Sequence, residues 1–150
     1  MFHKYIILIS IASAFLIVGG LFIWQSKGSD LEVVSINGIR IEIGRAVTTE
    51  EKIQGLSGRD TLGEYKGMLF AYDEPDTYSF WMKSMQFPID IIWIDGGHKV
   101  IDITKNIQPD SFPRSFKPKY PARYVLEVNA GFSDKNNVAI GDKVAGLELK

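Results

Sequence analysis

Residues 78–95 read YSFWMKSMQFPIDIIWID, and no other part of the chain after residue 30 is as apolar or as aromatic. Proline fixes φ and lacks an amide hydrogen, so Pro88 predicts a tight corner between two strands. The second strand is apolar on both faces, which predicts a central strand that is covered on both sides. Lys83 and Asp90 are the charged side chains set inside this apolar run.

The residues before this stretch predict a hairpin and a short helix. Asn37-Gly38 is a strong hairpin signal because both residues tolerate positive φ. The alternation of isoleucines with polar residues over 39–43 predicts a half-buried strand. Thr48 and Glu51 have the spacing of a capping box, which predicts a helix that ends near Gly55. Residues 68–72 predict a further strand, and the acidic residues 73–76 predict a solvated turn.

The residues after this stretch predict three more strands. Gly96-Gly97 predicts a hairpin turn onto residues 98–104. In residues 122–129 the even positions are expected to face the core and the odd positions, including Glu127, to face away. Residues 106–120 predict a surface loop, and residues 144–149 a last strand. Seven or eight short strands with one or two short helices predict a mainly β (α+β) fold, a compact β-barrel or sandwich.

The amino-terminal residues predict a membrane anchor. Residues 5–24 carry no charge, and as a helix they would span about 30 Å, the thickness of a bilayer core. A cleaved signal peptide is the alternative, but the apolar run is longer than such a segment requires. The prediction is a membrane anchor and linker over 1–29 and a soluble β domain over 30–150. Lys4 and the terminal amine precede the span, which favours an extracytoplasmic domain at the cell envelope.

Charge and cysteine content exclude several classes of function. After Lys4 and Lys27 are set aside, 15 basic and 18 acidic residues remain, a net charge of −3. A nucleic-acid-binding domain usually shows a basic face, so nucleic acid is not an expected partner. The chain has no cysteine, which removes disulfides, thiolate metal sites and cysteine nucleophiles. His3 and His98 lie far apart in sequence, and we predict no metal site and no cofactor.

An ordered set of short blocks resembles one family. The blocks are TEEK before Gly55-Leu56, GMLF at 67–70, SFWMKSM at 79–85, PIDI at 88–91, YVLEVNAG at 124–131 and Gly141-Asp142. Together they resemble the domain of unknown function 192 family, from about residue 33 to the end of the chain. The resemblance implies a compact, mainly β fold, often behind a signal or membrane segment, with no agreed activity. Ser84 departs from the family pattern, in which asparagine is usual.

The candidate ligand site consists of an indole, charged side chains and an amide. Lys83 and Asp90 are expected to flank a cleft lined by Trp81, with Arg59 and Asn129 nearby. The structural alternative is that Lys83 and Asp90 form an ion pair, or that Asp90 accepts backbone amides and holds the corner shut. Trp81 is a candidate for stacking on a sugar or an aromatic ligand, whereas Trp93 is expected in the core.

Three hypotheses follow from these features. The first is a non-enzymatic, membrane-tethered binding module for a small molecule or an envelope partner, with no catalytic residues. The second is an envelope hydrolase with Asp90 as base and Lys83 as electrostatic partner. The third is a scaffold that works through its anchor and its proline-containing loop. An enzyme requires Asp90 and Lys83 at a pocket floor, whereas a binding module requires only the aromatic wall.

Overall fold

In the computed structural model, which describes residues 32–147, seven strands form one sheet in the order β6-β5-β8-β3-β2-β1-β9. Two short strands, β4 and β7, pair separately. The strands are β1 (Glu32–Ile36), β2 (Ile39–Ala46), β3 (Lys66–Asp76), β4 (Phe80–Trp81), β5 (Ile89–Ile94), β6 (Val100–Ile107), β7 (Ser115–Phe116), β8 (Ala122–Asn129) and β9 (Val144–Ala145). The helices are α1 (Thr49–Gln54), α2 (Phe132–Lys135) and a 3-10 turn (Pro109–Ser111).

The predicted local signals at the start of the domain are confirmed. Asn37 and Gly38 have φ of 53° and 80° and join β1 to β2 as an antiparallel hairpin. Thr48 caps α1, its side chain accepting from the Glu51 amide while the Glu51 carboxylate accepts from the Thr48 amide. Gly55 follows α1 at a φ of 51°, a conformation that favours glycine. The capping box therefore fixes where α1 begins, and Gly55 fixes where it ends.

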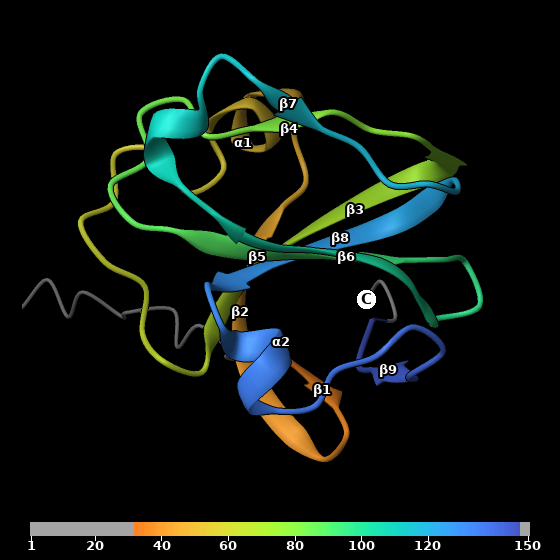
Figure 1. Ribbon diagram of the computed structural model, residues 1–150. Helices are drawn as coiled ribbons and strands as arrows, with labels where there is room; N and C mark the ends of the chain where they lie inside the picture. Colours follow the sequence, from red (N-terminus) through yellow and green to blue (C-terminus); the bar gives the residue numbers. More distant parts are fainter. Residues whose placement is uncertain (1–31, 148–150) are drawn as a thin grey trace, which may run out of the picture.

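The main sheet curls into a half-barrel and has an apolar core on each face. One core lies on the concave side of the sheet, inside the curl that ends at β9, and is covered by α2. The other lies between the opposite face and the layer that holds α1, β4 and β7, drawn above the sheet in Figure 1. All six residues of β5 are buried because this strand has a core on each side. The fold is thus mainly β, as predicted, with one curled sheet in place of a closed barrel.

The quoted stretch folds differently from the prediction in its first half. β5 is the predicted central strand, but β4 is only two residues long and pairs with β7 instead of with its neighbour in sequence. Ser84 adopts a φ of 56° between the two strands. The chain therefore turns before it reaches Pro88, which carries β4 out of the main sheet and into the covering layer.

Three further predictions are corrected by the structure. Residues 73–76 belong to β3, which has a register irregularity after Ala71, and do not form a separate turn. Among the described residues the last strand is shorter than predicted, Val144–Ala145. Val125 and Glu127 are buried, because the layer of α1, β4 and β7 covers the face of β8 that was expected to meet solvent. Alternation of apolar and polar residues along a strand identifies the buried face correctly only when the other face of the strand is exposed to solvent.

Within residues 32–147 no helix is long and apolar enough to cross a membrane. The predicted anchor, residues 5–24, lies outside the described residues.

Candidate functional site

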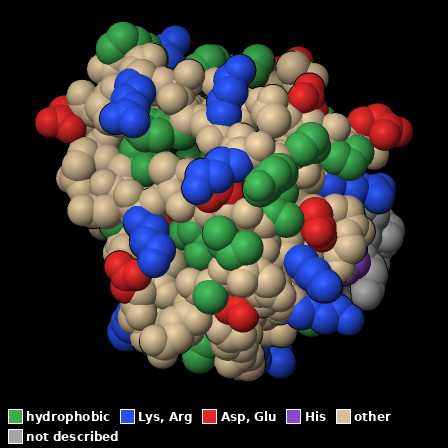
Figure 2. Space-filling view, turned by 45° about the vertical axis from the view of Figure 1, so that its right-hand side comes forward, with side chains coloured by type: hydrophobic (Ala, Val, Ile, Leu, Met, Phe, Trp, Pro, Cys, Tyr) green, Lys and Arg blue, Asp and Glu red, His purple; other side chains and the backbone are tan. Residues whose placement is uncertain are grey.

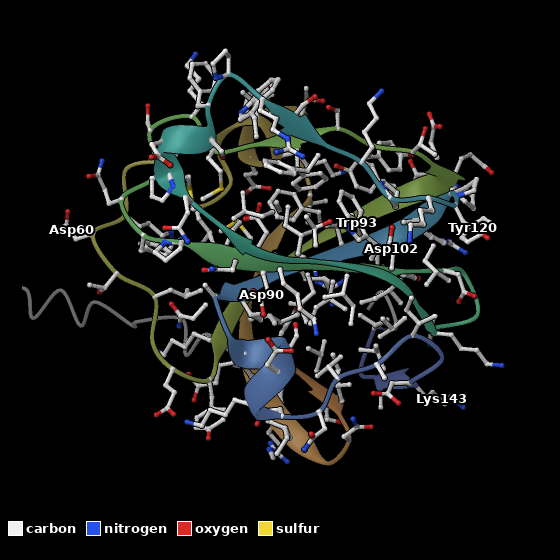
Figure 3. The ribbon with its side chains drawn as sticks, viewed as in Figure 1. Asp60, Asp90, Trp93, Asp102, Tyr120 and Lys143 are labelled. Atoms are coloured by element: carbon white, nitrogen blue, oxygen red, sulfur yellow. The ribbon has the colours of Figure 1, made fainter. Side chains whose placement is uncertain are left out.

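Asp90 is fully buried on the α2 face of the sheet. Its carboxylate accepts hydrogen bonds from the backbone amides of Asn106 at 2.8 Å, Gly131 at 3.2 Å and Ser133 at 2.9 Å. Figure 3 shows Asp90 beside α2, whereas Trp93 lies above the same sheet. Three amides satisfy a buried carboxylate without a cation, which is the structural role considered for Asp90. No ion pair forms between Asp90 and Lys83 among the described residues.

The structure does not bring the five candidate residues together. Lys83 and Arg59 have exposed side chains, and the Lys83 carbonyl accepts from the Ser57 hydroxyl at 2.8 Å. Asn129 donates from its side-chain amide to the carbonyls of Leu62 and Gly63 and so ties the 62–63 loop to β8. Of the five, only Trp81 lines the cavity of about 380 Å³ next to α1 and β4. Of the five residues, Trp81 therefore marks the candidate site.

The cavity beside Trp81 lies between α1, β4 and the β3–β8 pair. Its volume is about 380 Å³, within the range of about 300–1,000 Å³ that is common for small-ligand sites. The residues that line it are Thr49, Lys52, Ile53, Gln54, Gly55, Leu56, Ser57, Phe70, Tyr72, Ser79, Phe80, Trp81, Met85 and Glu127. The wall thus combines aromatic rings with hydroxyl, amide, ammonium and carboxyl groups.

Glu127 is the unusual group in this cavity. The side chain is 5% exposed, and its Oε2 has no hydrogen-bond partner among the described residues. Burial raises the pKa of Glu127 from 4.5 to about 8, because an ionised carboxylate loses its hydration there and gains no partner. At neutral pH the group is therefore largely the uncharged acid, which both donates and accepts hydrogen bonds.

The neighbouring β-strands and α1 set the position of Glu127. In the sheet Glu127 lies opposite Met68 of β3 and Ile91 of β5, which fixes its backbone between two paired strands. Gly55, at the end of α1, faces the carboxyl group: a Cβ on Gly55 would lie 3.8 Å from Oε2 and 3.2 Å from the Phe70 ring. The glycine thus allows the Phe70 ring to pack closely against the end of α1, where even a methyl group would crowd it.

The aromatic side chains leave one ring available to a ligand. Tyr72 stacks on Tyr78 with ring centroids 3.5 Å apart, and the Lys52 ammonium lies 4.4 Å from the Tyr72 centroid. Phe80 is buried and meets Phe70 edge to face. Trp81 is 45% exposed and lines the cavity. Trp93 is buried in the core as predicted, with its indole donating to the Thr104 hydroxyl at 3.0 Å.

Glu127 is the residue that sequence reasoning missed. Its odd position in β8 suggested a solvent-facing side chain, and a surface glutamate needs no explanation. The available signal was its apolar surroundings, since Val125, Leu126 and Val128 flank it in sequence. Lys52, Tyr72 and Gly55 were likewise not singled out. Their role depends on how α1 packs against the sheet, which no local pattern encodes.

The described residues offer no metal centre. Between residues 32 and 147 no group of three or more His, Asp or Glu side chains is placed to hold a metal ion. Glu127 is the single carboxyl group in the cavity lining, and a Mg²⁺ or Ca²⁺ site requires several oxygen ligands.

The fold and cavity define a mainly β protein with a half-barrel sheet and a cavity of about 380 Å³ under its covering layer. The chain belongs to the domain of unknown function 192 family: the family model, described as an uncharacterized ACR, matches residues 32–146. This confirms the resemblance found in the sequence. Among curated proteins, none matches this chain.

Two solved structures share the fold. A protein of unknown function from Novosphingobium aromaticivorans is 31% identical, with a TM-score of 0.71, over 75% of this chain and 82% of that chain. A protein from Sinorhizobium meliloti, provisionally described as a transcription regulator, is 30% identical, with a TM-score of 0.73, over 79% of this chain and 95% of that chain.

Proposed function

We propose that this protein is a membrane-tethered, non-enzymatic module that binds a small ligand in the cavity between α1 and β4. The observation that carries the proposal is the cavity beside Trp81, whose lining includes the buried Glu127, a side chain with an Oε2 that has no hydrogen-bond partner among the described residues. A polar group without a partner in an apolar site costs about 1–3 kcal/mol, and a ligand that supplies the partner recovers that free energy. The exposed ring of Trp81 adds an apolar surface beside it.

The chemistry of the lining favours binding over hydrolysis. A glycosidase uses a pair of carboxyl groups, and the cavity offers Glu127 alone. The Ser57 hydroxyl donates to the Lys83 carbonyl and has no histidine beside it in the lining, so it is no activated nucleophile. The alternative hydrolase with Asp90 as base finds no support, because backbone amides occupy that buried carboxylate.

The proposal also includes the location of the protein in the cell. The uncharged residues 5–24 support a single-pass anchor with the β domain outside the cytoplasm. A domain held at the cell envelope would meet envelope components and imported solutes, for which a cavity of this size suffices.

Regulation of transcription, the provisional description of the Sinorhizobium protein, is not the function we propose here. Residues 30–150 carry a net charge of −3. On the face drawn in Figure 2, basic and acidic side chains are interspersed with separate hydrophobic patches. A nucleic-acid-binding surface would gather its basic side chains into a continuous area.

The test is a ligand-observed NMR screen of neutral, cationic and anionic fragments against the full-length chain in lipid nanodiscs. We expect hits that bind wild type and are lost in Trp81→Ala, which removes the exposed wall of the cavity. Phe112→Ala is the matched control, because Phe112 is 46% exposed, close to the 45% of Trp81, and lies outside the cavity lining. Hits that are unaffected by Trp81→Ala, or no hits at all, would refute the proposal.

A further inference from the structure

The chemical class of the ligand can be argued from the groups that face Glu127. This step rests on the proposed function, because it concerns the same cavity. The strands and the helix around Glu127 each contribute side chains to the cavity. A ligand has to match the hydrogen-bonding groups and the charge of these side chains.

The ionisable groups that share the cavity with Glu127 are Lys52 on α1 and Tyr72 on β3. Burial raises the pKa of Tyr72 to about 12, so its hydroxyl stays uncharged. β4 contributes the neutral rings of Phe80 and Trp81, and β5 places apolar Ile91 opposite Glu127 in register. Lys52 is the only basic residue in the lining, and no described cation pairs with Glu127.

A cationic ligand fits this arrangement poorly. It would have to displace the proton from Glu127 and would meet the Lys52 ammonium in the same cavity. It would also lack an aromatic cage, since Tyr78 and Lys52 already lie against Tyr72. One free indole is a platform for a flat apolar face and does not enclose a charge.

A neutral ring with acceptor oxygens fits the same groups well. The Trp81 ring can cover the apolar face of a pyranose, and the hydroxyl and amide groups of Thr49, Gln54 and Ser79 line the same cavity. An uncharged Glu127 supplies a hydrogen-bond donor to an acceptor oxygen of that ring.

We propose that the cavity takes a neutral saccharide and that the Glu127 side chain, as a carboxylic acid, donates a hydrogen bond to one of its oxygens. Cationic amines are selected against by the same residue. The oxygen in question is the ring or a glycosidic oxygen, which accepts hydrogen bonds and has no proton to donate. Ionisation of Glu127 replaces the donor with a buried anion that repels this oxygen, so saccharide affinity falls as the pH rises. A carboxylate that bound an amine would give the opposite dependence.

The experiment compares matched neutral and cationic sugars by calorimetry on the full-length chain in lipid nanodiscs. The probes are the trimers of glucose, mannose and N-acetylglucosamine, and the cationic probe is the trimer of glucosamine. We expect at least one neutral trimer to bind wild type about tenfold or more tightly at pH 6 than at pH 9.5, because about one hydrogen bond to the acid is lost. The glucosamine trimer is expected to bind more weakly at pH 6 than the neutral trimer that binds.

Two variants separate the donor role from a packing role. Glu127→Gln keeps an amide donor and cannot ionise, so it should bind the neutral trimer at pH 6 and lose the pH dependence. Glu127→Leu keeps the bulk and removes the donor, so its affinity should fall about tenfold. Glu50→Gln changes an exposed glutamate of α1 outside the cavity lining and should leave both quantities unchanged. Thermal unfolding of each variant shows that the domain is folded.

The outcomes distinguish the two proposals. Amine binding that strengthens with pH, or neutral binding that is the same in wild type and Glu127→Leu, overturns the saccharide inference and leaves the cavity as a binding site. Absence of binding by all the neutral trimers, with fragment hits that depend on Trp81, also overturns the saccharide class alone. Absence of both sugar and fragment binding overturns the proposed function itself.

Discussion

The buried Glu127 is expected to affect the stability of the protein as well as ligand binding. Its pKa is about 8 in the folded protein and near 4.5 in the unfolded chain. Between these values only the folded state holds the proton, so the free energy of unfolding falls as the pH rises, by at most about 1.4 kcal/mol per pH unit. The contribution of protonated Glu127 to the free energy of unfolding is complete below pH 4.5 and is lost by about pH 8.

Glu127→Gln should remove this dependence, because the amide does not titrate. We expect the difference in unfolding free energy between Glu127→Gln and wild type to grow in favour of the variant from pH 5 to pH 8. Urea unfolding at several pH values measures it, and taking the difference cancels the titration of the other carboxyl groups. A difference that is flat with pH would show that the buried acid has a partner in solution.

Ser84 is a second residue with an energetic consequence. Its φ of 56° lies in the left-handed region, which costs an ordinary residue about 1–2 kcal/mol relative to glycine. Asparagine tolerates this conformation better than serine. The Ser84 carbonyl accepts from the Gly58 amide, and this bond does not depend on the side chain.

Ser84→Gly is therefore expected to stabilise the protein by about 1 kcal/mol, and Ser84→Asn by a smaller amount. Ser84→Ala is the control, since it removes the hydroxyl and keeps the Cβ that causes the strain. Thermal unfolding of the three variants measures the order. An increase in stability for Ser84→Ala equal to that for Ser84→Gly would show that the hydroxyl, and not the backbone, is responsible.

At the scale of elements, Asp90 connects three segments of the chain. It lies on β5 and accepts amides from Asn106 in β6 and from Gly131 and Ser133 at the start of α2. Asp90→Asn replaces one acceptor oxygen with a donor that faces an amide. We expect it to lower the free energy of unfolding by about 2–3 kcal/mol, the scale of a lost hydrogen bond to a buried charged group.

Asp110→Asn serves as the control for Asp90→Asn, because Asp110 is exposed and its side chain makes no hydrogen bond to a described residue. Its effect should stay within about 0.5 kcal/mol. Fragments that bind in the Trp81 cavity should still bind folded Asp90→Asn, since Asp90 lies on the opposite face of the sheet. Specific loss of these fragments with unchanged stability would assign Asp90 to the ligand site.

The elements differ in how well the sequence predicts them. The β1–β2 hairpin and α1 follow from residues that act within four positions, namely Asn37-Gly38 and the capping pair Thr48 and Glu51. β4 could not be predicted, because its partner is β7, some 35 residues away, and this pairing depends on the fold of the loop between them. Local signals thus predict turns and caps, while tertiary contacts decide strand partners.

The candidate site divides in the same way. Trp81 was found because its neighbours on the same face of the predicted strand, Ser79 and Lys83, are polar. Glu127 was missed because its meaning comes from the second layer, which converts the outer face of β8 into a buried one. Asp90 stood out in the sequence as a charge among isoleucines, yet the amides that satisfy it come from distant segments. A charged residue within an apolar stretch therefore indicates that its side chain needs polar partners in the fold. The structure is required to tell whether those partners belong to the fold or to a ligand.

At the scale of the whole molecule, the proposal joins a β domain to an apolar amino-terminal segment. Residues 5–24 hold no charge, whereas residues 25–30 are mostly polar. An anchor and a signal peptide differ in one physical outcome: the anchor stays in the bilayer at full length, and the signal peptide is removed. The prediction is that the intact chain of 16.9 kDa remains in the membrane pellet after an alkaline carbonate wash.

Leu16→Lys tests the physical basis of that prediction. A lysine near the middle of the segment costs about 2.5–3.5 kcal/mol on the insertion scale, so the variant should be partly released, whereas Leu16→Ile should behave as wild type. Protease added outside intact cells should cleave the β domain if it is extracytoplasmic. A shorter chain in the soluble fraction would establish cleavage instead. The cavity would then belong to a secreted binding protein, in which Trp81 and Glu127 keep the same roles because the cavity is formed within residues 32–147.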